Sequence, residues 1–157
     1  MESANPLMNP HQSPPPPTGR REPPLVLVVD DFEDNRAVYV EYLSSSGYRV
    51  AEAADGLQAV ELVRRLRPDV VVMDMTLPVM DGWQATRCLK SDTATRAIPI
   101  VALTGHTIGG PYGREARAAG CDEVLAKPCL PEKLAETIED LLGARAAEAQ
   151  LHRGDRD

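Results

Sequence analysis

Two runs of apolar residues in the chain end on aspartates. The first, "LVLVVDD" (25–31), ends on Asp30 and Asp31, and the second, "DVVVMD" (69–74), ends on Asp74. Because burying an unpaired carboxylate is costly, we expect these three side chains to share one site. Three carboxylates that converge repel one another and need a cation between them. A hard divalent ion that binds oxygen and keeps part of its water fits this set, which predicts Mg²⁺.

Two other residues at the ends of apolar runs could take part in phosphate chemistry. Thr104 ends "IPIVALT" (98–104), and Lys127 ends "DEVLAK" (122–127). A carboxylate beside Mg²⁺ can attack phosphorus as a nucleophile, and phosphoryl transfer otherwise depends mainly on positioning and charge stabilisation. Asp74 would then form an aspartyl phosphate, while Mg²⁺, Lys127 and the Thr104 hydroxyl stabilise its phosphoryl oxygens. No histidine or cysteine ends one of these runs, which disfavours zinc.

Short runs of β-branched and other apolar residues alternate with segments of helical periodicity. Strands are predicted at 25–30, 48–54, 69–74, 98–104 and 122–127, and helices at 35–46, 55–67, 84–90, 114–119 and from 131 onward. Five successive strand–helix units predict a doubly wound, flavodoxin-like α/β fold, with a five-stranded parallel sheet and helices on both faces. In such a sheet, functional groups gather at the carboxyl ends of the strands, near the switch in strand order. The candidate residues are therefore expected to meet at one edge.

Length and composition place limits on the folded domain. At 157 residues the chain has room for one domain with a core, plus tails. Eight of its fourteen prolines lie in residues 1–24, where we expect a disordered tail that is partly polyproline II. The folded domain is expected at 25–143, followed by a tail at 144–157 that extends the last helix and then becomes disordered. The "SPPPP" motif could dock in an aromatic groove, but a solvated tail is the simpler interpretation.

Charge and cysteine content disfavour several classes of protein. A net charge of −7 argues against a nucleic-acid or anionic-membrane surface, because phosphates need a basic footprint. No apolar run approaches the roughly 18 residues of a spanning helix, and the N-terminus lacks the basic-then-apolar order of a secretory signal. Three cysteines without metal-finger spacing do not indicate a disulfide framework. We therefore expect a cytoplasmic protein that binds neither nucleic acid nor membranes.

Four segments together resemble the receiver domain of two-component response regulators: "VVDDFEDNR", "VVMDMTLPVMDGW", "IPIVALTG" and "AGCDEVLAKP". The resemblance covers roughly Leu25 to Leu142 and implies a receiver fold in which an aspartate is phosphorylated with the help of Mg²⁺. The residue roles that it implies are Asp30 and Asp31 as the metal-binding acidic pair, Asp74 as phosphoacceptor and metal ligand, Thr76 as a metal ligand through its backbone carbonyl, Thr104 as the switch hydroxyl and Lys127 as the lysine of the site. The Lys127–Pro128 bond resembles one that is cis in this family.

Other positions are expected to modulate switching and the lifetime of the phosphoryl group. Gly105 matches the small residue that usually follows the switch threonine, whereas Val124 stands where the family often has an aromatic residue. The resemblance places Thr76 and His106 beside the path of attacking water, and so we expect both to influence dephosphorylation. The glycine-rich segment "HTIGGPYG" (106–113) predicts a loosely held fourth helix. We expect the output surface on that helix, the fifth strand and the fifth helix.

The resemblance implies a single-domain response regulator of the chemotaxis, polar-differentiation or phosphorelay type. A histidine kinase or histidine phosphotransfer protein would donate the phosphoryl group to Asp74. The signal would then pass through phosphorylation-dependent binding to another protein. We expect a monomer or weak dimer that catalyses its own phosphotransfer and dephosphorylation and is otherwise not an enzyme.

Three other classes of protein compete with this interpretation. A pseudo-receiver would keep the fold but act as a binding or adaptor module without phosphorylation. A phosphatase of the haloacid dehalogenase type needs a second aspartate two residues after the nucleophile, where Thr76 stands. A flavodoxin-like FMN binder has to cradle a phosphate in its first loop, which the acidic "DDFEDN" (30–35) would repel. Because every site position is filled, the sequence favours the phosphorylated receiver.

Overall fold

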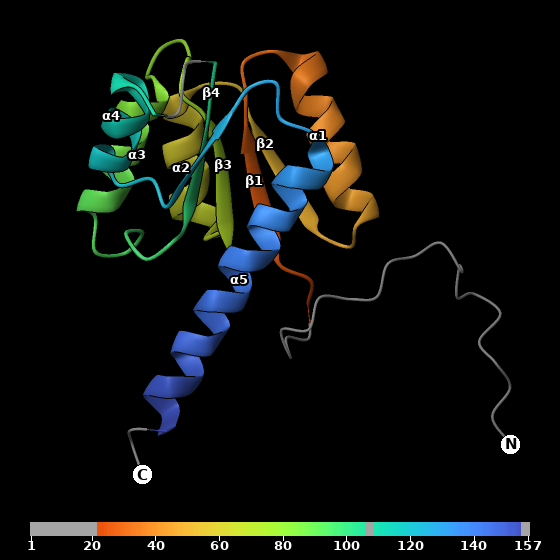
Figure 1. The fold of residues 1–157 in the computed structure, drawn as a ribbon, viewed down its shortest axis with the longest axis vertical. Coiled ribbons are helices and arrows are strands. Elements are labelled where there is room, and N and C mark those ends of the chain that lie inside the picture. Colours follow the sequence, from red (N-terminus) through yellow and green to blue (C-terminus); the bar gives the residue numbers. More distant parts are fainter. Residues whose placement is uncertain (1–21, 106–108, 155–157) are drawn as a thin grey trace, which may run out of the picture.

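The computed structural model describes residues 22–105 and 109–154. Strands and helices alternate along the chain as β1 (Leu25–Val29), α1 (Glu33–Ser45), β2 (Arg49–Ala53), α2 (Gly56–Leu66), β3 (Val70–Asp74), α3 (Gly82–Ser91), β4 (Ile100–Thr104), α4 (Pro111–Ala119), β5 (Glu123–Ala126) and α5 (Pro131–Gly154). The five strands are parallel and lie in the order β2-β1-β3-β4-β5 (Figure 1). The predicted architecture, a doubly wound parallel sheet of the flavodoxin-like type, is confirmed.

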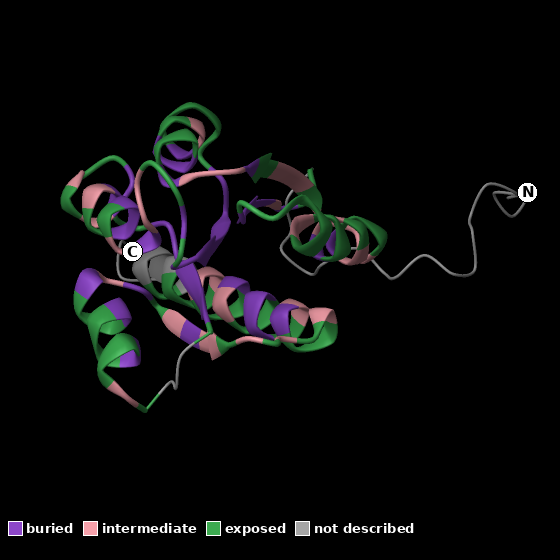
Figure 2. Cartoon of the chain, turned by 90° about the horizontal axis from the view of Figure 1, so that it is seen from above, coloured by how far each residue is buried: buried purple, intermediate pink, exposed green. Residues whose placement is uncertain are grey.

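The three central strands, β1, β3 and β4, are buried on both faces because they carry apolar residues at nearly every position. In β3, Val71 and Met73 face one core, and Val70 and Val72 face the other. The first core is closed by α2, α3 and α4, and the second by α1 and α5. Figure 2 shows the buried residues concentrated in the strands and on the sides of the helices that face them. Continuous apolar runs of this kind are what a parallel sheet covered by helices requires.

The register of the strands brings the candidate residues to one edge of the sheet. Met73 of β3 pairs with Val29 of β1, so that the next residues, Asp74 and Asp30, lie at neighbouring strand ends. Asp74 also pairs with Leu103 of β4, the residue that precedes Thr104. Since β2 and β3 flank β1 on opposite sides, this edge contains the switch in strand order where such folds bind ligands.

Three helices begin earlier than the sequence periodicity predicts, and the first is α1, which is expected from residue 35 and begins at Glu33. The expected start of α3 is Gln84, but the helix begins at Gly82 because Asp81 caps it. The Gln84 N–H donates to Asp81 Oδ1 at 2.8 Å, and the Asp81 N–H donates to Gln84 Oε1 at 3.3 Å. This reciprocal capping box satisfies donors that a helix end leaves open. Similarly, α4 is expected from Arg114 and begins at Pro111, since proline is well suited to the first helical position.

The buried face of α4 is made of small residues. Gly113, Ala116 and Ala119 are buried in α4, whereas α5 buries Leu134 and Ile138 completely. Because hydrophobic stabilisation grows with the apolar area that is buried, α4 gains less from packing than α5 does. This difference favours the prediction of a loosely held fourth helix.

The α5 helix continues to Gly154, and its last turns project beyond the sheet (Figure 1). Arg145 joins the projecting part to the domain, because its Nη1 donates to the carbonyl oxygen of Asp69 at 3.2 Å. Of the tails predicted at 1–24 and 144–157, residues 1–21 and 155–157 lie outside the described residues. Every helix in the described part of the chain is too short or too polar to span a bilayer.

Candidate functional site

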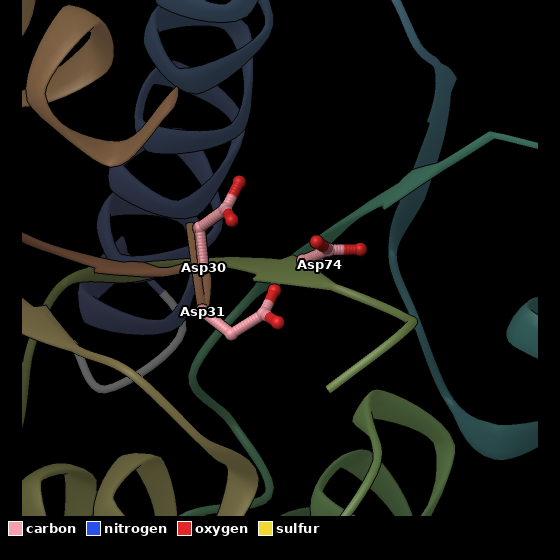
Figure 3. Close-up of side chains that lie close together, drawn as sticks. All are labelled: Asp30, Asp31 and Asp74. Atoms are coloured by element: carbon pink, nitrogen blue, oxygen red, sulfur yellow. The ribbon is translucent and has the colours of Figure 1, made fainter. Parts of the chain in front are cut away.

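Three carboxyl groups meet at the carboxyl edge of the sheet. Asp30 and Asp31 follow β1 and Asp74 ends β3, and one oxygen of each side chain lies within 4.8 Å of the others. Figure 3 shows the three side chains together beyond the two strand ends. Asp30 and Asp74 are 2% and 6% exposed, whereas Asp31 is open to solvent. The structure therefore contains the convergence that the strand ends predict.

The backbone of Asp30 is held on both sides. Its N–H donates to the carbonyl oxygen of Ala53, at the end of β2, at 3.1 Å, and its own carbonyl oxygen accepts from Arg36 Nη1 at 2.8 Å. Its side chain closes a turn, since Asp30 Oδ1 accepts the Phe32 N–H at 2.9 Å. Arg36 also donates from Nε to Glu52 Oε1 at 2.8 Å. The acidic turn is thereby tied to both α1 and β2.

The carboxylate of Asp74 accepts from one backbone donor and one ammonium. The Thr76 N–H donates to Oδ1 at 3.0 Å, and Lys127 Nζ lies 2.9 Å from Oδ2. Lys127 Nζ also lies 3.5 Å from Asp30 Oδ2, so that one ammonium bridges two buried carboxylates. Burial raises the pKa of Asp74 above its ordinary value, although the hydrogen bonds from Lys127 and Thr76 oppose the shift.

Lys127 is fixed through its backbone as well as its side chain. The Lys127 N–H donates to the carbonyl oxygen of Thr104 at 2.7 Å, and the Lys127–Pro128 peptide is cis, as the resemblance implied. Burial would lower the pKa of Lys127, but the hydrogen bond and charge of Asp74, together with the charge of Asp30, raise it overall. The lysine is therefore an ammonium at neutral pH, the form that stabilises anionic oxygens.

A hollow of about 390 Å³ lies beside Lys127, between α1 and the loop that follows β5. Its lining consists of Asn35, Val38, Tyr39, Lys127, Pro128 and Cys129. The Tyr39 O–H donates to the carbonyl oxygen of Cys129 at 2.8 Å, which joins α1 to this loop. Burial raises the pKa of Tyr39, and so the phenol remains a hydrogen-bond donor at neutral pH.

The loop between β3 and α3 is packed tightly against its neighbours. A Cβ atom at Gly82 would lie 2.5 Å from the carbonyl oxygen of Asp74, and only glycine fits such an approach. The Gly82 N–H donates to the carbonyl oxygen of Met75 at 3.1 Å, and the Gly56 N–H, at the start of α2, donates to that of Met80 at 3.0 Å. These contacts fix the loop that follows Asp74.

The donor set suits a divalent cation. Three carboxylates against one ammonium leave a formal charge of −2 at the site, which is the charge that a divalent ion offsets. Carboxylate oxygens are the ligands that Mg²⁺ prefers, and the ion usually keeps several waters. The exposed side of the cluster at Asp31 leaves room for such water.

The remaining candidate residues differ in their environments. Thr104 is buried at the end of β4, with 2% exposure, and Gly105 after it is exposed. Thr76 is exposed beside Asp74, and Val124 is buried in the core that α2, α3 and α4 close. His106 lies outside the described residues. Thr104 and Thr76 therefore share the edge with the aspartates, whereas Val124 is a core residue.

Four residues that contact the acidic turn or the neighbouring loops are not predicted from the sequence: Arg36, Glu52, Tyr39 and Gly56. A signal was available for Arg36, because it lies one helical turn after Phe32 and a helical side chain leans over the turn that precedes it. The contacts of the other three residues depend on how separate elements pack, and local sequence carries no such signal.

The strand order and the acidic cluster at the carboxyl ends of β1 and β3 define the class of this protein as a flavodoxin-like α/β receiver. The sequence profile of the response regulator receiver domain matches residues 26–139. The chain belongs to the response regulator receiver domain family.

Individual relatives agree with this assignment. The polar-differentiation response regulator DivK of Brucella anthropi is 36% identical over 118 residues, which cover 75% of this chain and 95% of DivK. The receiver domain of the sensor histidine kinase PA1611 from Pseudomonas aeruginosa PAO1 was solved with a magnesium ion coordinated in its active-site cleft. It is 37% identical, with a TM-score of 0.71 and coverage of 76% of this chain and 98% of that one. The chemotaxis response regulator CheY4 of Vibrio cholerae is 33% identical, with a TM-score of 0.70 and coverage of 75% and 98%.

Proposed function

We propose that this receiver domain accepts a phosphoryl group on Asp74 from a phosphohistidine donor and signals through phosphorylation-dependent binding to another protein. Asp30, Asp31, Asp74 and the backbone carbonyl of Thr76 would hold Mg²⁺. The observation that carries the proposal is the convergence of three carboxylates with one ammonium at the switch in strand order. The magnesium ion in the PA1611 receiver domain supports the choice of metal.

The hydrogen bonds of Asp74 suit it to act as the nucleophile. Transfer would form a bond between an Asp74 carboxylate oxygen and phosphorus, and would break the phosphorus–nitrogen bond of the donor, whose imidazole keeps the electron pair. The Thr76 N–H and Lys127 Nζ engage the two Asp74 oxygens at 3.0 and 2.9 Å. They hold the carboxylate in one orientation and so limit the directions from which phosphorus can approach.

Lys127 and Thr104 are proposed to stabilise the transferred group. The Lys127 ammonium already bridges Asp74 and Asp30, and a phosphoryl oxygen could replace one of these partners. The Thr104 hydroxyl, at the end of the next strand, would donate to another phosphoryl oxygen. The bound metal ion would supply further neutralisation of charge on the phosphoryl group.

Family membership supports the classes of partner that we propose. A histidine kinase or a histidine phosphotransfer protein is the donor that a receiver domain implies. The match to DivK covers 95% of that regulator, so a receiver domain makes up nearly all of a relative whose name describes a role in polar differentiation. Output through contact with another protein is accordingly proposed for this domain as well.

Treatment with acetyl phosphate, a small phosphodonor, tests the proposed acceptor. The parent chain should gain one phosphoryl group in the presence of Mg²⁺ and none in EDTA, as measured by intact mass. Asp74→Asn should abolish labelling because it removes the nucleophilic carboxylate. Asp31→Asn should reduce labelling because it removes one metal ligand. Borohydride reduction of the acyl phosphate should place the modification at residue 74.

A matched control is available at the same edge of the sheet. Asp55 caps α2, with its Oδ1 accepting the Gln58 N–H at 2.8 Å, and asparagine caps helices as well as aspartate does. Asp55→Asn should therefore be labelled like the parent. Full labelling of Asp74→Asn would refute the proposed acceptor. A parent chain that neither acetyl phosphate nor a phosphohistidine donor can label would instead support the pseudo-receiver.

A further inference from the structure

Arg36, in the first turns of α1, makes hydrogen bonds to two other segments. Its Nη1 donates to the carbonyl oxygen of Asp30 at 2.8 Å, and its Nε donates to Glu52 Oε1 of β2 at 2.8 Å. The Arg36 side chain is 16% exposed and that of Glu52 is 47% exposed. A guanidinium engaged at two of its nitrogens has a fixed orientation, because the group is planar and rigid.

These bonds complete a frame around Asp30. Its N–H is held by the Ala53 carbonyl at 3.1 Å, its carbonyl by Arg36, and its Oδ1 by the Phe32 N–H at 2.9 Å. Its Oδ2 faces the site, 3.5 Å from Lys127 Nζ. The turn therefore cannot rotate without breaking a hydrogen bond, and the turn sets the direction of the carboxylate of each aspartate in the acidic pair.

We propose that Arg36 is a positioning residue of the metal site. It donates a hydrogen bond to the carbonyl oxygen of Asp30, and Glu52 fixes its orientation. The acidic turn is therefore already ordered for cation binding before the ion arrives. The inference rests on the proposed metal site. A site whose ligands are already ordered binds more tightly, and hydrogen bonds that orient metal ligands contribute strongly to metal affinity.

The charge of Arg36 separates this proposal from a simple electrostatic effect. A positive charge near a cation site repels the cation, so Coulomb interactions alone predict tighter binding when the charge is removed. Loss of the hydrogen bond to the Asp30 carbonyl predicts weaker binding of the cation. The two explanations therefore give opposite signs for Arg36→Met.

Binding of Mn²⁺ to the unphosphorylated chain tests the proposal, with free Mn²⁺ followed by electron paramagnetic resonance and Mg²⁺ as competitor. Arg36→Met should weaken binding about tenfold to hundredfold, the usual range for a partner of a metal ligand. Arg36→Lys keeps the charge but lacks the planar fork that spans both acceptors, and should also weaken binding. The double variant Arg36→Met/Glu52→Gln has the net charge of the parent. It should bind Mn²⁺ as weakly as Arg36→Met does, because both substitutions disrupt the same set of hydrogen bonds around Asp30.

Arg49→Met is the matched control. Arg49 lies at the start of β2, at the amino ends of the strands and so at the opposite end of the sheet from the site. It donates from Nε to the Pro23 carbonyl at 2.9 Å and pairs with Glu22 at 3.6 Å. It therefore makes the same types of contact away from the site, and its variant should bind Mn²⁺ like the parent. Urea unfolding without metal separates the effects, because a merely structural arginine would change the free energy of unfolding and not the affinity of the folded chain.

Two results would overturn the positioning role. One is binding of Mn²⁺ by Arg36→Met that equals or exceeds that of the parent, and the other is unchanged binding by Arg36→Lys. A parent chain that fails to bind Mn²⁺ would overturn the proposed metal site itself, and the inference with it.

Discussion

Asp30, Asp31 and Asp74 place three like charges within 4.8 Å, and Lys127 supplies one opposite charge among them. Burial raises the pKa of Asp74 in spite of the Lys127 hydrogen bond, so the ammonium does not fully offset the loss of hydration. Residues arranged for function in this way commonly lower the stability of the fold. A cation that binds the folded chain would recover that stability through linkage.

Asp31→Asn is expected to stabilise the metal-free chain and to remove most of its stabilisation by Mg²⁺. Asparagine keeps the size of the side chain and removes one repelling charge, which at this separation is worth about 1 kcal/mol when water screens the pair fully. Urea unfolding in EDTA should therefore give a higher free energy of unfolding than the parent has. Added Mg²⁺ should then raise it by less than in the parent.

The control for this prediction is Asp140→Asn, which removes an exposed carboxylate on α5, outside the acidic cluster. It should respond to Mg²⁺ like the parent. If Asp31→Asn is no more stable than the parent in EDTA, or gains as much from Mg²⁺, the three carboxylates do not act as one site.

At the scale of elements, α2 supports the loop that follows Asp74. The Gly56 N–H, at the start of α2, donates to the Met80 carbonyl at 3.0 Å, and a Cβ atom at residue 56 would overlap that carbonyl. Gly143, in α5, differs because nothing lies within 4 Å of the place where its Cβ would be. Both glycines lie in helices. Comparing alanine substitutions at the two positions therefore separates the effect of the close contact from that of helix propensity.

Gly56→Ala is expected to lower the free energy of unfolding by about 2–3 kcal/mol, because the added methyl group displaces the Met80 backbone. The same shift should move the β3–α3 loop and reduce labelling by acetyl phosphate. Gly143→Ala should raise the free energy of unfolding by about 0.5–1 kcal/mol, since alanine is the better helix former, and should leave labelling unchanged. Urea unfolding and intact mass measure the two effects, and a neutral Gly56→Ala would mean that α2 does not support the loop.

In the molecule as a whole, α4 is held by small buried residues and by an aromatic contact. The ring centroids of Tyr112 in α4 and Trp83 in α3 lie 6.2 Å apart, and the angle between the two ring planes is 45°. Such pairs contribute about 0.5–1.5 kcal/mol beyond the area that they bury. Val124, where the family often has an aromatic residue, is 3% exposed in the core. The Trp83–Tyr112 pair joins α4 to α3.

Beryllofluoride with Mg²⁺, a mimic of the phosphoryl group, is expected to change amide hydrogen exchange in α4 more than in α2. Weakly packed segments open at low free energy, and a small difference in contacts can shift their population. Tyr112→Ala should speed exchange at residues 110–119 without the mimic, because it removes the aromatic contact. Tyr112→Phe keeps the ring and its aromatic contact, and so its exchange at residues 110–119 should be slower than that of Tyr112→Ala. Unchanged exchange at 110–119, with a response on another face, would place the output surface elsewhere.

The sequence by itself determined which edge of the sheet carries the candidate site. Continuous apolar runs mark where β1 and β3 stop, and a parallel sheet brings the carboxyl ends of all its strands to the same edge. Asp30 and Asp74 could therefore be placed together without coordinates. The starts of α3 and α4 were less predictable, because capping by Asp81 and the position of Pro111 decide them rather than periodicity.

The tertiary structure alone decided how these aspartates are held. Lys127 reaches Asp74 across 53 residues of sequence, and Arg36 reaches Glu52 across 16. Contacts of this kind depend on the distance and angle at which helices and loops pack on the sheet. Apolar periodicity specifies which face of an element is buried, but a polar side chain at the rim can take several directions until its neighbours are in place. For that reason the frame around Asp30 emerges with the packed fold.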